Sequence, residues 1–215
     1  MAEGVKRRSY DSTRRRAAAQ QRRSRILQAA AELFLAEGYP RTTVAAIAQR
    51  ADVSEDLVFL LFTNKRGVLK EVMDVAIGGD DEDIPLLERE GPRAVQAATD
   101  QREQLRLFAA GITSQLDRVR PFNDLVRSAA AVEPEITALQ DDLHLRQRRF
   151  AMRMVATWLA ANGPLRNEMS VEAAAAILWT LASPDVYRML TVHWSWSREQ
   201  YQDWLRETLV AALLP

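Results

Sequence analysis

Residues 23–70 read RSRILQAAAELFLAEGYPRTTVAAIAQRADVSEDLVFLLFTNKRGVLK, and this stretch decides the fold of the N-terminal part of the chain. Apolar residues recur at helical spacing from Ile26 to Phe34, which predicts an amphipathic helix. Gly38 and Pro40 follow directly, and both residue types end helices.

Polar residues that cap helices mark the starts of the next three. Thr42 and Thr43 are natural N-caps of a short second helix, Ser54 is that of a third, and Asn64 is that of a fourth. The second and third helices are separated by a tight turn of about three residues. Two short helices joined in this way form the motif that places a helix in the major groove of DNA.

This stretch resembles the TetR family of transcriptional repressors. The resemblance is carried by residues 26–27, 30–34, 38–39, 42–44, 47–48, 51–54 and 62–65, and residues 177–188, ILWTLASPDVYR, also resemble the C-terminal part of many members. It implies an all-α fold with an N-terminal three-helix helix-turn-helix headpiece and a helical body that binds a small-molecule effector and forms the homodimer.

Charge is distributed unevenly along a chain whose formal net charge is zero. Residues 1–77 contain 14 Lys and Arg against 9 Asp and Glu, and the first 25 residues contain nine basic and two acidic side chains. Such an asymmetry directs the N-terminal end toward a polyanion. The first residues have no apolar face before Ile26, so residues 1 to about 18 are expected to be disordered in isolation.

The predicted organisation is a basic flexible arm over 1–22, a helix-turn-helix DNA-binding domain over 23–77 and a ligand-binding and dimerisation domain over 78–215. Gly78 and Gly79 begin the acidic loop that separates the last two. Polar/apolar alternation is not sustained anywhere, so no strand is expected. In the body, helices are predicted from Asp100 to about 118, from Pro121 to 131, from 135 to 161 as the longest, from Ser170 to about 182, and from Ser197 to about 214.

Candidate DNA-binding residues lie in and around the two short helices. They are Arg41, Thr42, Thr43, Ser54, Glu55, Leu57, Phe59, Leu60 and Lys65. The third helix departs from the family at these positions, because it offers two acids and three large apolar residues where members often have basic, hydroxyl and aromatic polar side chains. An acid accepts from cytosine N4 and an apolar side chain packs on a thymine methyl, while phosphates are left to the second helix, Lys65 and the arm.

Large side chains recur on stripes of the body helices. The candidate ligand-binding residues are Phe108, Phe150, Met154, Trp158, Trp179 and Tyr187, and the candidate dimer-interface residues are Ile177, Tyr201, Trp204, Leu205 and Leu209. For each residue alone, packing in a core is the commoner explanation. As a set, aromatic and Met side chains enclose apolar ligands, and the resemblance assigns an effector to the body and a dimer to its last helices.

Several classes of function find no support. The chain has no cysteine, no phosphate-binding glycine loop, no nucleophile elbow and no His spacing typical of a metal site, so we expect neither an enzyme, a metal centre nor a cofactor. No apolar run reaches the length of a membrane span and no secretory signal is present, so a cytoplasmic location is expected.

The sequence therefore favours a ligand-responsive transcriptional regulator, acting as a repressor, that binds a palindromic operator as a dimer and is released by a small hydrophobic effector. Its expected partners are double-stranded DNA, the effector and a second copy of the chain, without a membrane. The alternative is a dimeric ligand-binding or protein-interaction module whose headpiece does not read DNA.

Overall fold

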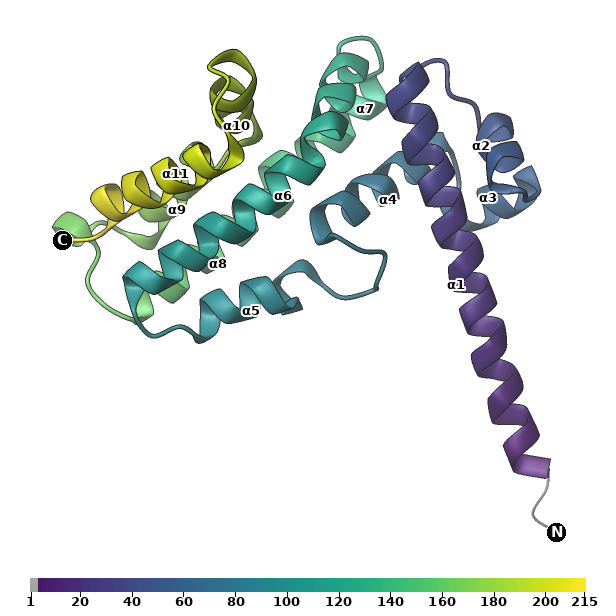
Figure 1. Ribbon diagram of the computed structural model, residues 1–215, viewed down its shortest axis with the longest axis horizontal. Coiled ribbons are helices and arrows are strands. Elements are labelled where there is room, and N and C mark those ends of the chain that lie inside the picture. The colour runs from purple at the N-terminus through teal and green to yellow at the C-terminus, as the bar shows by residue number, and fades with distance from the viewer. Residues whose placement is uncertain (1–3) are drawn as a thin grey trace. The chain divides into compact units, whose positions relative to one another are not determined.

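The computed structural model describes residues 4–215, and side chains from residue 14 onward except that of His144. The side chains of Lys6, Arg7 and Arg8 in the predicted arm therefore lie outside the described residues. The described chain is helical and contains no strand, which confirms the all-α fold (Figure 1). It divides into two compact units, Met1–Asp74 and Val75–Pro215, so the boundary falls three residues before the predicted one.

The first unit, the headpiece, contains α1 (Gly4–Glu37), α2 (Val44–Ala51), α3 (Glu55–Phe62) and most of α4 (Lys65–Gly78). Its caps follow the sequence prediction: Thr43 accepts from the amide of Ala46, Ser54 from that of Leu57, and Asn64 from that of Gly67. The four helices enclose a small core, made of Ile26, Ala30, Phe34, Tyr39, Ile47, Val58, Phe62, Val68 and Leu69.

Helix α1 is longer than the sequence analysis expected. It begins at Gly4, whereas residues 1 to about 18 were predicted to be disordered. Ala17, Ala18 and Ala19, together with the neighbouring Arg and Gln residues, have high helix propensity, so the helix of the headpiece extends backward from Ile26. In the structure, therefore, the arginines near this end are presented on a helix.

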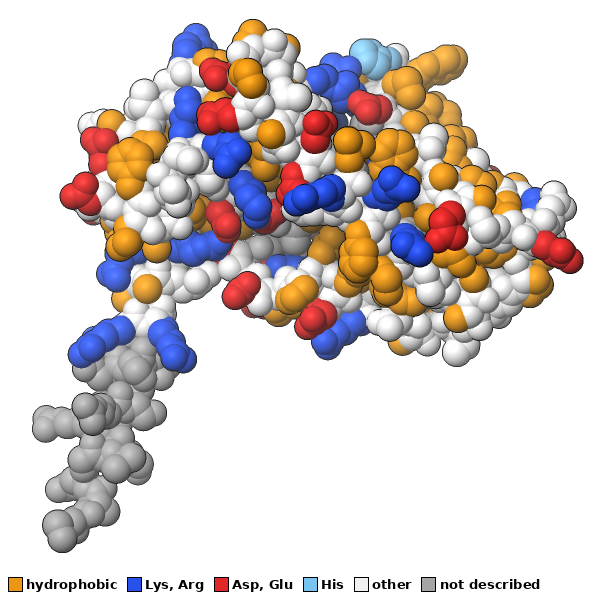
Figure 2. Space-filling model, turned by 180° about the vertical axis from the view of Figure 1, so that it is seen from behind, with side chains coloured by type: hydrophobic (Ala, Val, Ile, Leu, Met, Phe, Trp, Pro, Cys, Tyr) orange, Lys and Arg blue, Asp and Glu red, His pale blue; other side chains and the backbone are white. Residues whose placement is uncertain are grey.

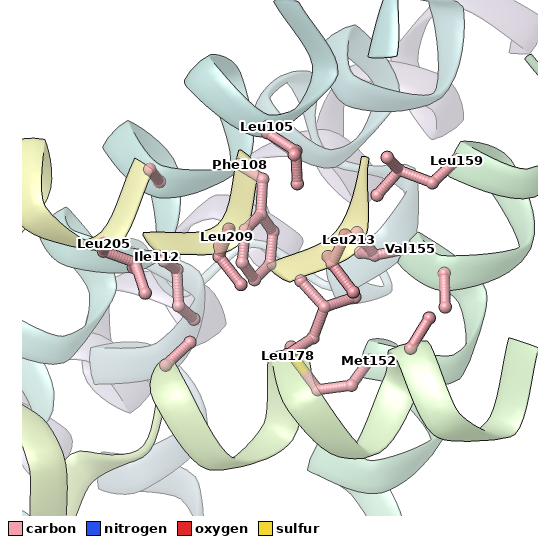
Figure 3. Packing of buried hydrophobic residues seen from close by; sticks show 14 of the residues in the cluster. Leu105, Phe108, Ile112, Met152, Val155, Leu159, Leu178, Leu205, Leu209 and Leu213 are labelled. Carbon is pink, nitrogen blue, oxygen red and sulfur yellow. The ribbon is translucent and has the colours of Figure 1, made fainter. Parts of the chain in front are cut away.

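The second unit, the body, is built around α6 (Gln101–Ala130), with α8 (Arg148–Ala161), α9 (Val171–Leu181) and α11 (Arg198–Leu213) packed about one core. Its smaller helices are α5 (Glu90–Ala97), α7 (Pro134–Asp141), α10 (Pro184–Arg188) and the short turns Leu86–Glu88 and Arg166–Glu168. Figure 3 shows apolar side chains from four helices pointing toward one another, among them Phe108 of α6, Val155 of α8, Leu178 of α9 and Leu209 of α11. This burial is the main source of the body's stability.

The prediction that the helix from residue 101 stops before Pro121 was wrong, because α6 continues through the proline to Ala130. A proline inside a helix costs about 3 kcal/mol. Buried side chains lie on both sides of it, with Leu116 and Val119 before and Val126 after. Burial of both halves, in which α6 packs on α5 and α11 and also on α7 and α10, outweighs that cost.

The segment predicted as one helix over 135–161 is interrupted. Helix α7 is followed by a π-helical turn, Asp142–Gln147, and then by α8. The longest helix of the body is α6 instead. A π-helical turn is a rare insertion within a helix, and the sequence analysis found no signal of it.

Candidate nucleic-acid interface and ligand cavity

The turn between α2 and α3 has the geometry of a helix-turn-helix motif. Asp52 adopts a left-handed conformation, with φ 53° and ψ 56°, and its amide donates to the carbonyls of Ala48 and Gln49. An Asp side chain tolerates this conformation better than most residues. Val53 then donates to the carbonyl of Ala48 over 3.0 Å, and Ser54 opens α3. The chain thus turns within three residues, as the sequence predicted.

The outward face of α3 is apolar and acidic. Val58 and Phe62 are buried in the headpiece, while Phe59, Leu60 and Leu61 are 47%, 79% and 43% exposed. Ser54, Glu55 and Asp56 at the start of the helix are exposed too, and Leu57 is half-buried. On this face of α3, the hydroxyl of Ser54 is the one side-chain group that could donate a hydrogen bond to a base or a phosphate. The other side chains of the face can pack on apolar groups or, in the case of the two acids, accept hydrogen bonds from the exocyclic amines of bases.

Three candidate DNA-binding residues already have partners within the headpiece. Thr42 is fully buried and its hydroxyl donates to the carbonyl of Gly38 over 2.9 Å, so its assignment to the DNA surface was wrong. Lys65 donates to the carbonyl of Tyr39 over 2.9 Å and its ammonium lies 4.2 Å from the centre of the Tyr39 ring. Arg41 donates to the carbonyl of Glu37. All three side chains donate to backbone carbonyls at the end of α1 and in the loop after it. These carbonyls need donors, and the hydrogen bonds order the loop that leads into α2.

Positive charge accessible to a polyanion is concentrated on α1. Arg14, Arg15 and Arg16 are exposed, and Figure 2 shows basic side chains on both sides of this helix beside the residues drawn in grey. Arg23, further along, is taken up in an ion pair with Glu71 of α4. Arg50 of α2 pairs with Glu32 over 2.7 Å at the surface. Of these groups, the arginines at 14–16 are the ones that fit the predicted arm.

The body contains a cavity of about 270 Å³. Most of its wall is apolar, and its polar groups come from α6 and from the segment after α4. The lining residues are Ile77, Gly78, Leu86, Leu87, Arg89, Gly91, Pro92, Val95, Leu107, Phe108, Gly111, Ile112, Ser114, Gln115, Arg118, Ala151, Met152, Val155 and Trp158. An apolar space with a few polar groups at one side is the usual form of a small-molecule site.

Two of the six predicted ligand residues, Phe108 and Trp158, line this cavity. Phe150 and Met154 do not line it, and Phe150 is 60% exposed, so their part in a ligand site stays a prediction. A stripe at i, i+4, i+8 drifts by about 40° per step, so its two ends face different directions. In α8 the buried side is occupied by Ala151, Met152 and Val155, and only the Trp158 end of the stripe reaches it.

Trp179 and Tyr187 were also expected to line the ligand site, and both have other contacts. The carbonyl of Trp179 accepts from the guanidinium of Arg148, which lies 5.2 Å from the centre of the Trp179 ring. Burial lowers the pKa of Arg148 to about 10. Tyr187 is buried, donates to Asp117 over 2.9 Å and packs edge-on against Tyr201. Its hydroxyl therefore fixes α10 to α6.

Three of the predicted dimer-interface residues are core residues. Tyr201, Leu205 and Leu209 are fully buried within one chain, so their side chains cannot contact a second copy. Helix α11 uses this face to pack on α6 and α9. Ile177 and Trp204 remain partly exposed, and they stay candidates for an interface.

Sequence reasoning missed the polar part of the cavity wall. Arg89 donates to the carbonyls of Gly78 and Glu82 and pairs with Asp80 over 2.7 Å. Arg118 donates to the carbonyls of Ala76 and Ile77, at the C-terminal end of α4. The two arginines are 29 positions apart in the sequence, so no spacing rule connects them. The one local signal in the sequence is the Gly-rich break that ends α4, because the free carbonyls at the end of that helix require hydrogen-bond donors.

No helix within the described residues has the length and apolar character needed to cross a membrane.

Comparisons with known proteins agree with this geometry. Residues 26–72 match the model of the bacterial regulatory proteins of the tetR family. The HTH-type transcriptional regulator HbdR of Aromatoleum sp. (strain CIB) is 33% identical over 141 residues, which cover 63% of this chain and 57% of HbdR. The uncharacterised HTH-type transcriptional regulator YvkB of Bacillus subtilis (strain 168) matches over 26% of its length. The chain thus spans between a quarter and somewhat over half of these curated relatives.

Solved structures show the same fold over nearly the whole chain. NalD of Pseudomonas aeruginosa, the secondary repressor of the MexAB-OprM multidrug efflux pump, aligns with a TM-score of 0.64 at 19% identity, covering 91% of this chain and 97% of NalD. SmeT in complex with triclosan aligns with a TM-score of 0.63 at 20% identity, covering 90% and 92%. Residues 26–72, with the capped turn at Asp52, thus match the helix-turn-helix domain of the tetR family regulators, and the solved structures share the fold of the chain.

Proposed function

We propose that this protein binds double-stranded DNA as a homodimer and represses transcription until a small, largely hydrophobic molecule enters the cavity of its body. The observation that carries the proposal is the helix-turn-helix geometry: a three-residue turn at Asp52 that leaves the outer face of α3 exposed from Ser54 to Leu61. A helix presented in this way fits the major groove.

Contacts to DNA are divided between two parts of the headpiece. The arginines of α1 supply positive charge for the phosphates, and α3 supplies Glu55, Phe59 and Leu60 for the base edges. Thr43 and the N-terminus of α2 add a phosphate-binding position. Because most of the charge lies on α1, affinity should depend strongly on salt and on that helix.

Dimerisation is assigned to the sides of α9 and α11 that the core leaves free. Ile177 and Trp204 are partly exposed there, beside the small residues Ala173, Ala176 and Thr208. Small side chains allow two helices to approach closely, and a second copy doubles the number of bases that are read.

The mechanism is a two-state equilibrium in which DNA favours one arrangement of the two headpieces and the cavity ligand favours the other. This function places the protein in the cytoplasm.

Support for the ligand comes from the cavity and from a protein of the same fold. The wall at Leu107, Phe108 and Trp158 is apolar, and SmeT has been crystallised with triclosan, a small molecule. An apolar cavity lined by aromatic side chains suits a molecule of mainly hydrophobic surface.

The test is binding to DNA from the protein's own promoter region. We expect fluorescence anisotropy to show sequence-dependent binding. The logarithm of the binding constant should fall linearly with the logarithm of the salt concentration. Adding apolar small molecules should then release the DNA. Binding that is the same for promoter DNA and for random DNA of equal length, or no binding at low salt, would contradict the proposal.

A second function is favoured by the surface of α3. Phe59, Leu60 and Leu61 are exposed beside Glu55 and Asp56, and such an apolar and acidic face suits a protein partner better than a phosphate backbone. In that case the headpiece would bind protein, and the arginines of α1 would contribute no DNA affinity. The same anisotropy experiment separates the two functions.

A further inference from the structure

The polar part of the cavity wall carries more positive than negative charge. Arg89 and Arg118 line it directly, and Arg198 of α11 donates to Ser114, which lines it too. Three guanidinium groups thus gather at one side of a space that is otherwise apolar.

The carboxylates near these arginines are already engaged. Asp80 pairs with Arg89, and the hydrogen bonds from Arg89 hold the pKa of Asp80 below its usual value. Asp117 accepts from the hydroxyl of Tyr187 over 2.9 Å. Within the described residues, Arg118 has carbonyl partners but forms no ion pair with a carboxylate. An anion entering the cavity would therefore meet a guanidinium that forms no ion pair with a carboxylate.

The present bonds of Arg118 are long. Its Nε lies 3.2 Å from the carbonyl oxygen of Ala76, and one terminal nitrogen lies 3.4 Å from that of Ile77. Bonds of this length to neutral acceptors are weaker than the bonds of about 2.8 Å that a guanidinium forms with a carboxylate. Burial lowers the pKa of Arg118, the nearby cations Arg198 and Arg89 lower it further, and the carboxylates of Asp117 and Asp80 raise it by smaller amounts, so a further negative group in contact with it would be favourable.

The apolar wall begins next to these groups. Phe108 and Ile112 lie on the same helix as Arg118, and Val155 and Trp158 of α8 complete that side of the cavity. One molecule can therefore place a hydrophobic body against these side chains and a charged group at the arginine.

We propose that the cavity takes a small amphiphilic anion, an acid with one carboxylate, whose apolar part lies against Phe108 and Trp158 and whose carboxylate binds Arg118. This inference deepens the proposed ligand response, and its meaning for DNA release rests on that proposed function. It refines the hydrophobic effector that the sequence suggested to one that carries charge at one end.

The test uses three probes with the same eight-carbon chain: octanoate, 1-octanol and octylamine. Isothermal titration calorimetry on the full chain should show octanoate binding about tenfold more tightly than octanol, a difference of about 1.4 kcal/mol. Octylamine should bind most weakly, because its ammonium meets the arginines. Raising the salt concentration should weaken octanoate more than octanol.

Variants locate the charged contact. Arg118→Gln should bring octanoate down to the affinity of octanol, while Arg118→Lys should keep a preference for the anion. Arg102→Gln is the matched control, because Arg102 is an exposed arginine of the same helix outside the cavity wall, and the preference should persist. Circular dichroism checks that each variant is folded. If Arg118→Gln is unfolded, the comparison is made with Arg118→Lys.

The inference is overturned if the parent protein binds octanol as tightly as octanoate, if Arg118→Gln weakens both equally, or if none of the three probes binds. These outcomes are independent of DNA. A preference for octanoate without any binding to promoter DNA would reject the proposed function and leave the inference standing. Release of DNA by octanol but not by octanoate would reject the inference and leave the proposed function standing.

Discussion

Replacing Leu209 by alanine tests whether α11 is a core helix or an interface helix. The side chain of Leu209 is fully buried within a single chain, in the cluster that also holds Phe108 and Leu205 (Figure 3). Removing a fully buried leucine side chain costs about 2.7–5.0 kcal/mol, because transfer free energy is lost and a cavity remains. In a chain of this size each kcal/mol lowers Tm by about 2–4 °C, so we expect a drop on the order of 10 °C.

Tryptophan fluorescence during heating is the suitable assay. All five tryptophans lie between residues 158 and 204, so the signal reports the body. Leu145→Ala is the control: its side chain is 53% exposed, and the expected change is within about 0.5 kcal/mol. Sedimentation should show the same oligomeric state for Leu209→Ala and the parent protein below the transition.

The reasoning is refuted by either of two results. One is a Leu209→Ala variant that melts within about 2 °C of the parent, well inside the shift expected for a buried leucine. The other is a variant that becomes monomeric while its unfolding free energy, measured at low protein concentration, is unchanged. The second result would return Leu209 to an interface between two copies.

Four further predictions concern other parts of the molecule. Deleting residues 1–18 should weaken DNA binding uniformly across sequences and reduce the slope of log affinity against log salt by about 0.9 per lost phosphate contact; an unchanged slope would speak against the arm. Leu60→Ser should change stability by no more than about 0.5 kcal/mol, because the side chain is 79% exposed, yet should lower promoter affinity in anisotropy measurements; equal affinity would favour the protein-binding alternative. Ile177→Glu should shift the sedimentation profile toward monomer if α9 is at the interface, whereas Glu172→Gln, an exposed change on the same helix, should not. Burial, with the hydrogen bond to Asp117, raises the pKa of Tyr187, so its contribution to stability is complete below the unfolded pKa of about 10 and is lost as pH rises above it; Tyr187→Phe should flatten that alkaline fall in denaturant titrations, and an identical pH profile would contradict the assignment.

The sequence by itself determined the helices of the headpiece and their ends. The hydroxyl and amide caps at Thr43, Ser54 and Asn64 act on backbone groups within three residues, so their effect is local and readable from spacing. The capping box of Ser197 and Gln200, and the N-cap at Asp100, were predictable for the same reason. The TetR resemblance rests on this local pattern.

Tertiary structure decided which residues face which partner. A stripe of large side chains indicates that a helix buries one side, but the core of one chain, a cavity and a second copy all select the same residue types. Leu205 therefore looked like an interface residue and is buried in its own chain, and Phe150 looked like a pocket residue and is exposed.

The polar groups of the cavity were beyond sequence reasoning for a different reason. Arg89 and Arg118 come together because the C-terminal end of α4 exposes carbonyls that both side chains reach. That meeting depends on the tertiary packing of the body, and no sequence periodicity indicates it. The sequence thus determined the local elements and the family resemblance of the headpiece, while the three-dimensional packing alone placed charge beside the apolar cavity.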